Sequence, residues 1–327
     1  MKMIPFFLFV FLQQLHVVAQ VKWVNVDSNF SELPKNFHVF KTTDSLDGKP
    51  FIAYYAEADL KDKHLQFTTD STYKRRLTPQ QFYQKNKQPL LVVNGTFFSY
   101  STNQNLNVLI KDGQILGYNI HSYPGRGKDT LTYSHPFGSA LGITKKRTAD
   151  VAWLFTDSLN RNIYALQYAS PAIKDSLRNF DFEHAKKYAT ISNRQLSQIN
   201  VKFKKWKVKT AIGGGPVLVQ NGEVAVSNNE ELKFKGKEIN DKHPRTCMGF
   251  TKNGKLIVMV IQGRYANAAG ATLTQEAQLL KGLGCVEALN LDGGGSSCML
   301  INGKETIKPS DKEGERAVPG VFIVDVK

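Results

Sequence analysis

The chain has 327 residues, of which 43 are Lys or Arg and 28 are Asp or Glu, so its formal net charge at pH 7 is +15. Hydrophobic residues make up 41% and charged residues 22%, which excludes extensive disorder and collagen-like repeats. The only apolar stretch that approaches membrane length lies at the N-terminus, which excludes a multi-span membrane protein. No Pro-rich or Ser-rich linker divides the chain, so we expect one domain.

The N-terminal segment has the pattern of a secretory signal peptide. A basic residue precedes an apolar run over residues 4–12, and the small residue Ala19 stands at a plausible cleavage point. The run is shorter than the ~20 residues that a membrane-spanning helix needs. We therefore expect removal of residues 1–19, export to the periplasm or the exterior, and no stable membrane insertion afterwards. Residues 20–52 have no predicted role, and residues 53–327 form the expected domain.

Turn sequences typical of tight hairpins separate apolar runs at four places. Asn-Gly and Asp-Gly accept the positive φ that such turns require. The four turns are Asp112-Gly113, Asn221-Gly222, Asn253-Gly254 and Asn302-Gly303. They predict mixed, largely antiparallel sheets. The basic segment 202–209 contains interleaved aromatics, but we interpret it as an edge strand with a solvated Lys face and expect no nucleic-acid partner.

Helical signals are fewer than strand signals. A Thr-Pro pair predicts a helix over residues 78–86, because Thr caps a helix and Pro suits its first turn. Residues 274–283 form the clearest helix, with Thr272 and Gln275 spaced for a capping box. Residues 180–190 are a weaker candidate. The expected fold class is therefore α+β, with a few packing helices.

The three cysteines, Cys247, Cys285 and Cys298, lie among apolar or small residues. An odd number without a CxxC pair argues against a disulfide framework and against a zinc ribbon, so we expect buried thiols. No ligand spacing calls for a metal. We expect no cofactor, although the sequence leaves a divalent metal open.

The strongest local feature is Asp292, which ends an apolar strand and is followed by Gly293, Gly294 and Gly295. Successive backbone N–H groups in such a turn form an anion-binding nest, and a carboxylate beside it suits the activation of water near a phosphate. The structural alternative is a tight turn capped by Asp292. A similarly built loop, Gly213-Gly214-Gly215, precedes another strand.

Three further residues are candidates with equally ordinary alternatives. Arg245 offers a planar donor fork that binds phosphate bidentately, or it forms a surface ion pair. Asn94 has the chemistry to bind a sugar hydroxyl, although a simple turn explains it when it is taken alone. Glu276 is either a second carboxylate for acid–base work or a charge that compensates a helix dipole.

Together, these motifs resemble the phosphodiester glycosidase family. The motifs are Asn94-Gly95-Thr96-Phe97-Phe98, Gly213-Gly214-Gly215-Pro216, His243-Pro244-Arg245-Thr246 and Asn290-Leu291-Asp292-Gly293-Gly294-Gly295-Ser296. Their order and spacing match from about Ala53 to Val326. The resemblance implies a site at Asn94, Arg245, Glu276, Asp292, Gly293, Gly294, Gly295, Ser296 and Arg316. We add Arg264 and the loop 213–215 as substrate-binding candidates.

The resemblance implies hydrolysis of a sugar 1-phosphodiester at the anomeric carbon, which releases a free sugar and a phosphomonoester. N-acetylglucosamine is one candidate sugar. We expect Arg245 and the glycine nest to hold the phosphate. Asp292 then either acts as the base toward water or stabilises the oxocarbenium-like carbon, and Glu276 is the alternative partner. Two rival functions stay open. One is a non-catalytic glycan- or cell-wall-binding protein, and the other is a phosphodiesterase that cuts the P–O bond.

Overall fold

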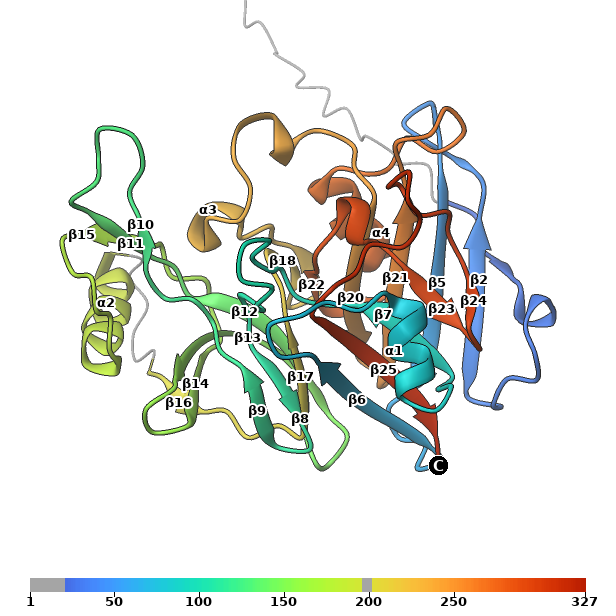
Figure 1. Ribbon diagram of the computed structural model, residues 1–327, viewed down its shortest axis with the longest axis horizontal. Coiled ribbons are helices and arrows are strands. Elements are labelled where there is room, and N and C mark those ends of the chain that lie inside the picture. The colour runs from blue at the N-terminus through green and yellow to red at the C-terminus, as the bar shows by residue number, and fades with distance from the viewer. Residues whose placement is uncertain (1–20, 196–201) are drawn as a thin grey trace, which may run out of the picture.

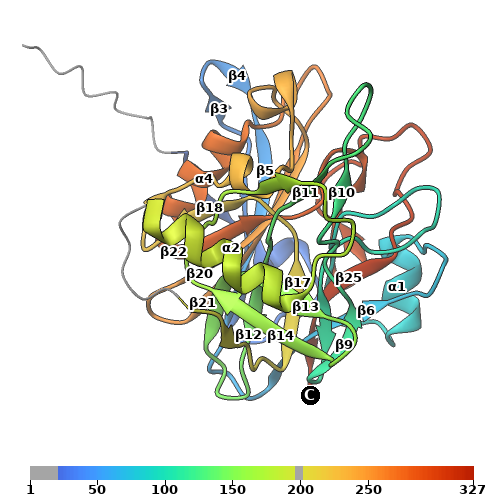
Figure 2. The ribbon, with the colours of Figure 1, turned by 90° about the vertical axis from the view of Figure 1, so that its left-hand side faces the viewer.

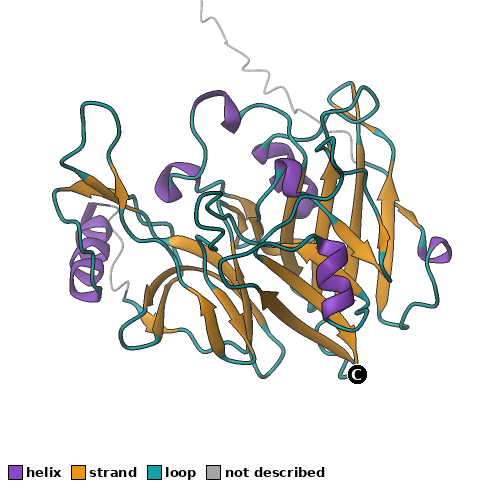
Figure 3. Cartoon of the chain, viewed as in Figure 1, coloured by secondary structure: helices purple, strands orange, loops and turns teal. Residues whose placement is uncertain are grey.

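The computed structural model describes residues 21–195 and 202–327, so the predicted signal segment lies outside the described residues. Three large antiparallel sheets dominate the fold, and short helices lie at their edges and faces (Figures 1 and 3). Every strand pair within the described ranges is antiparallel, which confirms the largely antiparallel prediction. The α+β label understates how far strands outweigh helices.

The largest sheet has eight strands. Its order is β1 (Val24–Asn25), β2 (Phe37–Thr42), β5 (Ile52–Asp59), β21 (Lys255–Gln262), β20 (Arg245–Thr251), β22 (Cys285–Asn290), β18 (Val217–Gln220) and β19 (Glu223–Val224). β2 pairs with β5 over its full length. The segment without a predicted role, residues 20–52, therefore supplies the strands β1 and β2 at one side of this sheet.

Two other large sheets complete the core. The seven-stranded sheet has the order β16 (Lys204–Lys205), β14 (Asn162–Leu166), β13 (Ala149–Asp157), β12 (Gly138–Ile143), β17 (Thr210–Gly213), β8 (Leu109–Lys111) and β9 (Gln114–Gly117). The five-stranded sheet has the order β24 (Lys304–Glu305), β23 (Met299–Ile301), β7 (Leu91–Asn94), β25 (Gly320–Val326) and β6 (Leu65–Ser71). The basic segment 202–209 contributes the edge strand β16, as predicted. One buried apolar cluster draws residues from all three sheets.

Smaller ribbons and helices surround these sheets. The ribbons are β10 (Tyr123–Pro124), β11 (Tyr133–His135) and β15 (Ile173–Asp175), and separately β3 (Ser45–Leu46) and β4 (Lys49–Pro50). The helices are α1 (Pro79–Lys85), α2 (Phe182–Gln195), α3 (Asn228–Glu231) and α4 (Leu273–Gly282), with the 3-10 turns η1 (Asp27–Asn29), η2 (Gly236–Ile239) and η3 (Gly294–Ser296). Figure 2 shows α2 over the strands β13 and β14.

The helix caps, hairpin turns and buried thiols expected from short sequence motifs are present in the structure. The predicted capping box is present at the start of α4, where Thr272 and Gln275 bond reciprocally, and the predicted Thr cap at the start of α1 also forms a capping box, with Gln81. The four predicted hairpin turns join β8 to β9, β18 to β19, β20 to β21, and β23 to β24. All three cysteines are free and buried, as expected. Within the described ranges, no helix has the length and apolar character needed to cross a bilayer.

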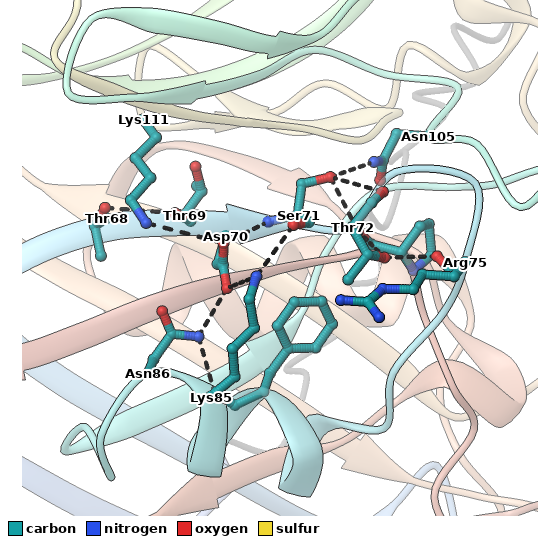
Figure 4. A network of polar contacts seen from close by, with 12 residues as sticks. Thr68, Thr69, Asp70, Ser71, Thr72, Arg75, Lys85, Asn86, Asn105 and Lys111 are labelled. Atoms are coloured by element: carbon teal, nitrogen blue, oxygen red, sulfur yellow. Dashed lines mark hydrogen bonds and ion pairs between the residues drawn. The ribbon is translucent and has the colours of Figure 1, made fainter.

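A polar network connects β6 to α1 and to the segment before β8 (Figure 4). Lys85 Nζ lies 2.6 Å from the carboxylate of Asp70 in β6. The next residue, Ser71, accepts a hydrogen bond from Asn105 Nδ2 at 3.0 Å. The side-chain oxygen of Asn105, Oδ1, in turn accepts a hydrogen bond from the Thr96 hydroxyl. The turn that follows β7 is therefore held on one side by a polar network that reaches α1.

Candidate active site

The loop after β22 brings together three motifs that are far apart in the sequence. The Asp292 N–H donates to the carbonyl of Gly95 at 3.0 Å. The Gly294 N–H donates to the carbonyl of Pro244 at 2.8 Å. These backbone bonds hold the Asp292 loop between the turn after β7 and the segment that enters β20.

Asn94 fixes this arrangement with its side chain. The Asn94 amide group donates to the backbone carbonyl of Asp292 at 2.6 Å. Its carbonyl oxygen accepts from the Thr246 hydroxyl at 2.8 Å and from the Cys298 N–H at 3.1 Å. Asn94 is fully buried, so its side chain positions the loop in place of the predicted contact with a sugar hydroxyl.

The Asp292 carboxyl is half-buried beside the glycines. Burial raises the pKa of this carboxyl to about 6, against the lowering effects of the Ser296 hydroxyl, the Arg316 guanidinium and the Gly293 N–H. The group is therefore ionised at neutral pH and takes up a proton in mild acid. A carboxylate with a pKa just below the working pH suits a general base.

The glycines that follow Asp292 let two guanidinium groups lie against the backbone. A side-chain carbon at Gly294, where φ is 62°, would lie 3.2 Å from Arg264 Nη2. At Gly295 it would overlap Arg316, which binds Asp311 bidentately at 2.7 and 2.9 Å. The loop therefore needs glycine at position 295 for packing. The two guanidinium groups packed against it lie near the Asp292 carboxylate.

The expected anion-binding nest is only partly available. The Gly294 N–H is already bonded to the carbonyl of Pro244, and the Gly293 N–H interacts with the Asp292 carboxyl. Since these donors are engaged within the protein, the nearby guanidinium groups are the better source of phosphate contacts.

Arg245 begins β20 and is almost completely buried, with 2% of its surface exposed. Its Nε donates to the carbonyl of Ala271 at 3.0 Å, and its guanidinium lies 5.4 Å from the centre of the Phe234 ring. Burial lowers the pKa of Arg245, and the nearby Glu276 carboxyl counteracts that effect. Arg245 is therefore held in one orientation under an aromatic cover.

Glu276 lies in the first turn of α4 and is fully buried. Neither of its carboxylate oxygens accepts a hydrogen bond of normal geometry from the described residues. Burial raises the pKa of Glu276 to about 7, and Arg245 and the Cys247 thiol oppose this rise. A carboxyl with no exposed surface suits the positioning of Arg245 better than proton transfer at a sugar.

The second glycine loop lies beside the first. The Gly215 N–H donates to the carbonyl of Asn290 at 2.7 Å, and Asn290 Nδ2 donates to the carbonyl of Gly215 at 2.8 Å. The Gly214 N–H donates to the carbonyl of Ser139 at 3.0 Å, and a side chain at Gly213 would lie 2.7 Å from Asn107 Cβ. Gly213–Gly215 therefore supports the end of β22 through its backbone.

Sequence reasoning did not single out Lys233 and Phe234. Phe234 covers Arg245 and meets the Phe97 ring edge-on at 5.9 Å between centroids. Lys233 Nζ lies 5.1 Å from the centre of the Phe97 ring. Both residues belong to an irregular, Lys-rich segment between α3 and β20, where no periodicity or motif marks them.

The surrounding side chains do not include an obvious metal cluster. Over residues 21–195 and 202–327, no three His, Cys, Asp or Glu side chains are grouped in a way that would hold a metal ion.

A family model and several curated proteins match parts of this chain. The family model described as phosphodiester glycosidase matches residues 173–325. The SPbeta prophage-derived uncharacterized protein YomE of Bacillus subtilis is 38% identical over 81 residues, which cover 25% of this chain and 12% of that protein. Mouse N-acetylglucosamine-1-phosphodiester alpha-N-acetylglucosaminidase is 29% identical over 102 residues, covering 29% of this chain and 20% of that protein. The matched regions therefore span one fifth or less of these relatives.

Solved structures share the fold. A hypothetical protein from Synechocystis matches with a TM-score of 0.59 at 16% identity, covering 90% of this chain and 62% of that one. The zebrafish N-acetylglucosamine-1-phosphodiester alpha-N-acetylglucosaminidase catalytic domain, auto-inhibited by its pro-peptide, matches with a TM-score of 0.55 at 20% identity, covering 94% and 89%. At these identities the likeness shows the fold alone.

Proposed function

From the premise that the chain resembles the phosphodiester glycosidase family, we propose that it is an exported hydrolase of sugar 1-phosphodiesters. Cleavage occurs at the anomeric carbon and yields a free sugar and a phosphomonoester. N-acetylglucosamine is the first sugar to test, because it occurs in the names of the mouse and zebrafish relatives. Export rests on the N-terminal pattern.

One observation carries this proposal: the Asp292 carboxylate adjoins a glycine loop against which Arg264 and Arg316 lie. Arg264 is the main counter-charge for the phosphodiester, because Arg316 is already paired with Asp311, and both guanidinium groups stabilise the charge that develops on the departing phosphate. Asp292 accepts a proton from water as the water oxygen bonds to the anomeric carbon. The bond between that carbon and the phosphate oxygen breaks, and its electron pair leaves with the phosphate.

The remaining candidates support this centre. Asn94 fixes the Asp292 loop through the Asp292 carbonyl. Glu276 lies close enough to Arg245 to influence its titration, and we assign it a positioning role. A phosphomonoester dianion is a stable leaving group, so the site needs no strong general acid beside the scissile oxygen.

Product analysis tests the proposal. The mature protein is incubated with an N-acetylglucosamine 1-phosphodiester, with and without a chelator, and the products are separated. We expect free N-acetylglucosamine and a phosphomonoester. Sugar 1-phosphate would instead assign P–O cleavage, and saturable binding without product across a panel of sugar diesters would assign a binding protein. Activity that the chelator abolishes would add a metal requirement to the mechanism.

A further inference from the structure

The Glu231 carboxylate at the end of α3 is satisfied by neutral donors. It is 2% exposed, and it accepts hydrogen bonds from the Ser227 hydroxyl at 2.7 Å and the Ser139 hydroxyl at 2.8 Å. It also accepts from the Val217 N–H at 2.9 Å and from Trp153 Nε1 at 3.1 Å. The carboxylate therefore has its hydrogen-bonding partners without an ammonium group.

Two residues further on, Lys233 is half-buried and lacks such partners. Among the described residues its ammonium group donates no hydrogen bond. It lies over the Phe97 ring at 5.1 Å; burial lowers the pKa of this ammonium group, and the nearby Glu231 carboxylate opposes that effect by favouring the charged form. Its carbon chain passes beside Gly215, where an added side-chain carbon would lie 2.5 Å from Lys233 Cε. A partly desolvated cation without a direct acceptor is a strong attractor of anions.

Two aromatic rings, Phe97 and Phe234, lie between the Lys233 ammonium group and Arg245, which is next to the Asp292 loop. Phe97 meets Phe234 at 5.9 Å, and Phe234 faces the Arg245 guanidinium at 5.4 Å. Arg245 in turn adjoins the catalytic loop, since a side-chain carbon at Gly293 would lie 3.9 Å from Arg245 Cδ. Two cations therefore stand at opposite ends of an aromatic pair, and only one end adjoins Asp292.

We propose that Lys233, supported by Phe97 and Phe234, binds a second negative charge of the substrate beyond the scissile phosphodiester. The aromatic pair packs against the apolar face of the group that links the two charges. The matching substrate class is a chain of repeating sugar phosphates, in which a further phosphate follows the one that is cleaved. This inference rests on the proposed function and names the substrate class of the same site.

Two matched diesters test the inference. In both, N-acetylglucosamine 1-phosphate is esterified to a propyl group, and in one of them the far end of the propyl group carries a phosphate. The ratio of kcat/KM for the charged and the neutral diester is measured for the wild type, Lys233→Gln, Lys233→Arg and Lys235→Gln. We expect the wild type to prefer the charged diester and Lys233→Gln to reduce the preference about tenfold, while Lys233→Arg keeps most of it.

Lys235→Gln is the matched control, because Lys235 is an exposed neighbour on the same segment. It should retain the wild-type ratio. An unchanged ratio in Lys233→Gln, or an equal loss in Lys235→Gln, would overturn the inference. Circular dichroism checks that the variants fold, which we expect because Glu231 keeps its hydrogen bonds.

A binding measurement separates the inference from the proposed function. If the wild type hydrolyses neither diester, the proposed function fails, and calorimetry with non-hydrolysable phosphonate analogues of the same pair tests Lys233 alone. The second anion contact is supported if the wild type binds the charged analogue more tightly than the neutral one and if Lys233→Gln removes this difference. Equal binding of the two analogues by the wild type would overturn it.

Discussion

The side-chain amide of Asn94 donates a hydrogen bond to the backbone carbonyl of Asp292 across 2.6 Å, which joins positions 198 residues apart in the sequence. Asn94 ends β7 in the five-stranded sheet, whereas Asp292 follows β22 in the eight-stranded sheet. The position of the Asp292 loop is therefore set where two sheets meet, by an amide that is itself fully buried.

We predict that Asn94→Ala loses both stability and activity. The substitution leaves the carbonyl of Asp292, the Thr246 hydroxyl and the Cys298 N–H without this partner, and it should cost about 2–4 kcal/mol in the free energy of unfolding. Chemical denaturation measures the loss. Asn160→Ala is the control, because Asn160 is exposed and bonds only within its own turn, to Asp157. Equal stability of the two variants would refute the role of Asn94.

The two glycines after Gly293 should respond differently to alanine. At Gly295 the new methyl group overlaps the bidentate pair of Arg316 and Asp311, so we expect kcat/KM to fall by about 100-fold or more. At Gly294 the methyl group meets only the flexible end of Arg264, and the cost is chiefly the left-handed backbone, about 1 kcal/mol.

Gly113→Ala is the control for that backbone cost. Gly113 has a φ of 82°, and an alanine there would have open space around its methyl group. Steady-state kinetics and thermal denaturation of the three variants separate the two effects. The packing argument is wrong if Gly295→Ala retains the activity of Gly294→Ala.

The pH dependence of kcat/KM should show the titration of the Asp292 carboxyl group. Since the base must be ionised and its pKa is raised to about 6, activity should fall about tenfold per pH unit below that value. The Ser296 hydroxyl lowers this pKa, so Ser296→Ala should move the acidic limb to higher pH. A pH profile of wild type and variant checks both statements. An acidic limb that does not move would exclude an effect of Ser296 on Asp292, and activity that does not fall below pH 6 would exclude Asp292 as the titrating group.

Glu276 should make the protein less stable as the pH rises. Burial raises its pKa from 4.5 to about 7, so the folded state binds a proton that the unfolded state has already released. The associated stability is complete below the unfolded pKa and is lost as the pH rises through the folded one. At about 1.4 kcal/mol per pKa unit, the loss is roughly 3 kcal/mol.

Glu276→Gln should remove this part of the pH dependence. Denaturation of wild type and variant is compared across the interval between the two pKa values, 4.5 and about 7. Other buried carboxyls titrate in both proteins, so the difference between the two curves isolates Glu276. Parallel curves would show that Glu276 is ionised in the folded protein throughout.

Asp292→Asn should abolish turnover without unfolding the protein. The amide has the same shape but accepts no proton, so we expect a loss of about 1,000-fold or more in kcat. Stability should be unchanged or higher, because burial already disfavours the charged form of Asp292. Normal turnover by this variant would remove Asp292 from the mechanism.

The sequence predicted the features that arise from local chemistry. The turns at Asn221-Gly222 and Asn302-Gly303 and the capping box of Thr272 and Gln275 depend on residues close together in the chain. The triple glycine after Asp292 was recognisable because three glycines in a row are costly to order without a reason.

The roles that depend on contacts between distant segments were not predictable. Asn94 could be proposed as a site residue, but its bond to Asp292 exists only because the ends of strands from two different sheets meet. Lys233 is one lysine among many, and it becomes distinctive only because Glu231 is satisfied by hydroxyl, indole and backbone donors from other strands. Similarly, only packing shows that Glu276 lies fully buried near Arg245.

The most direct test of the central claim is the fate of the water oxygen. The protein without residues 1–19 is incubated with an N-acetylglucosamine 1-phosphodiester in water enriched in oxygen-18. Mass spectrometry of the freshly quenched products locates the label, with a correction for exchange at the anomeric carbon of the free sugar. Attack at the anomeric carbon predicts label in the N-acetylglucosamine and none in the phosphomonoester. Label in the phosphate product would contradict the account, because water would then have attacked phosphorus.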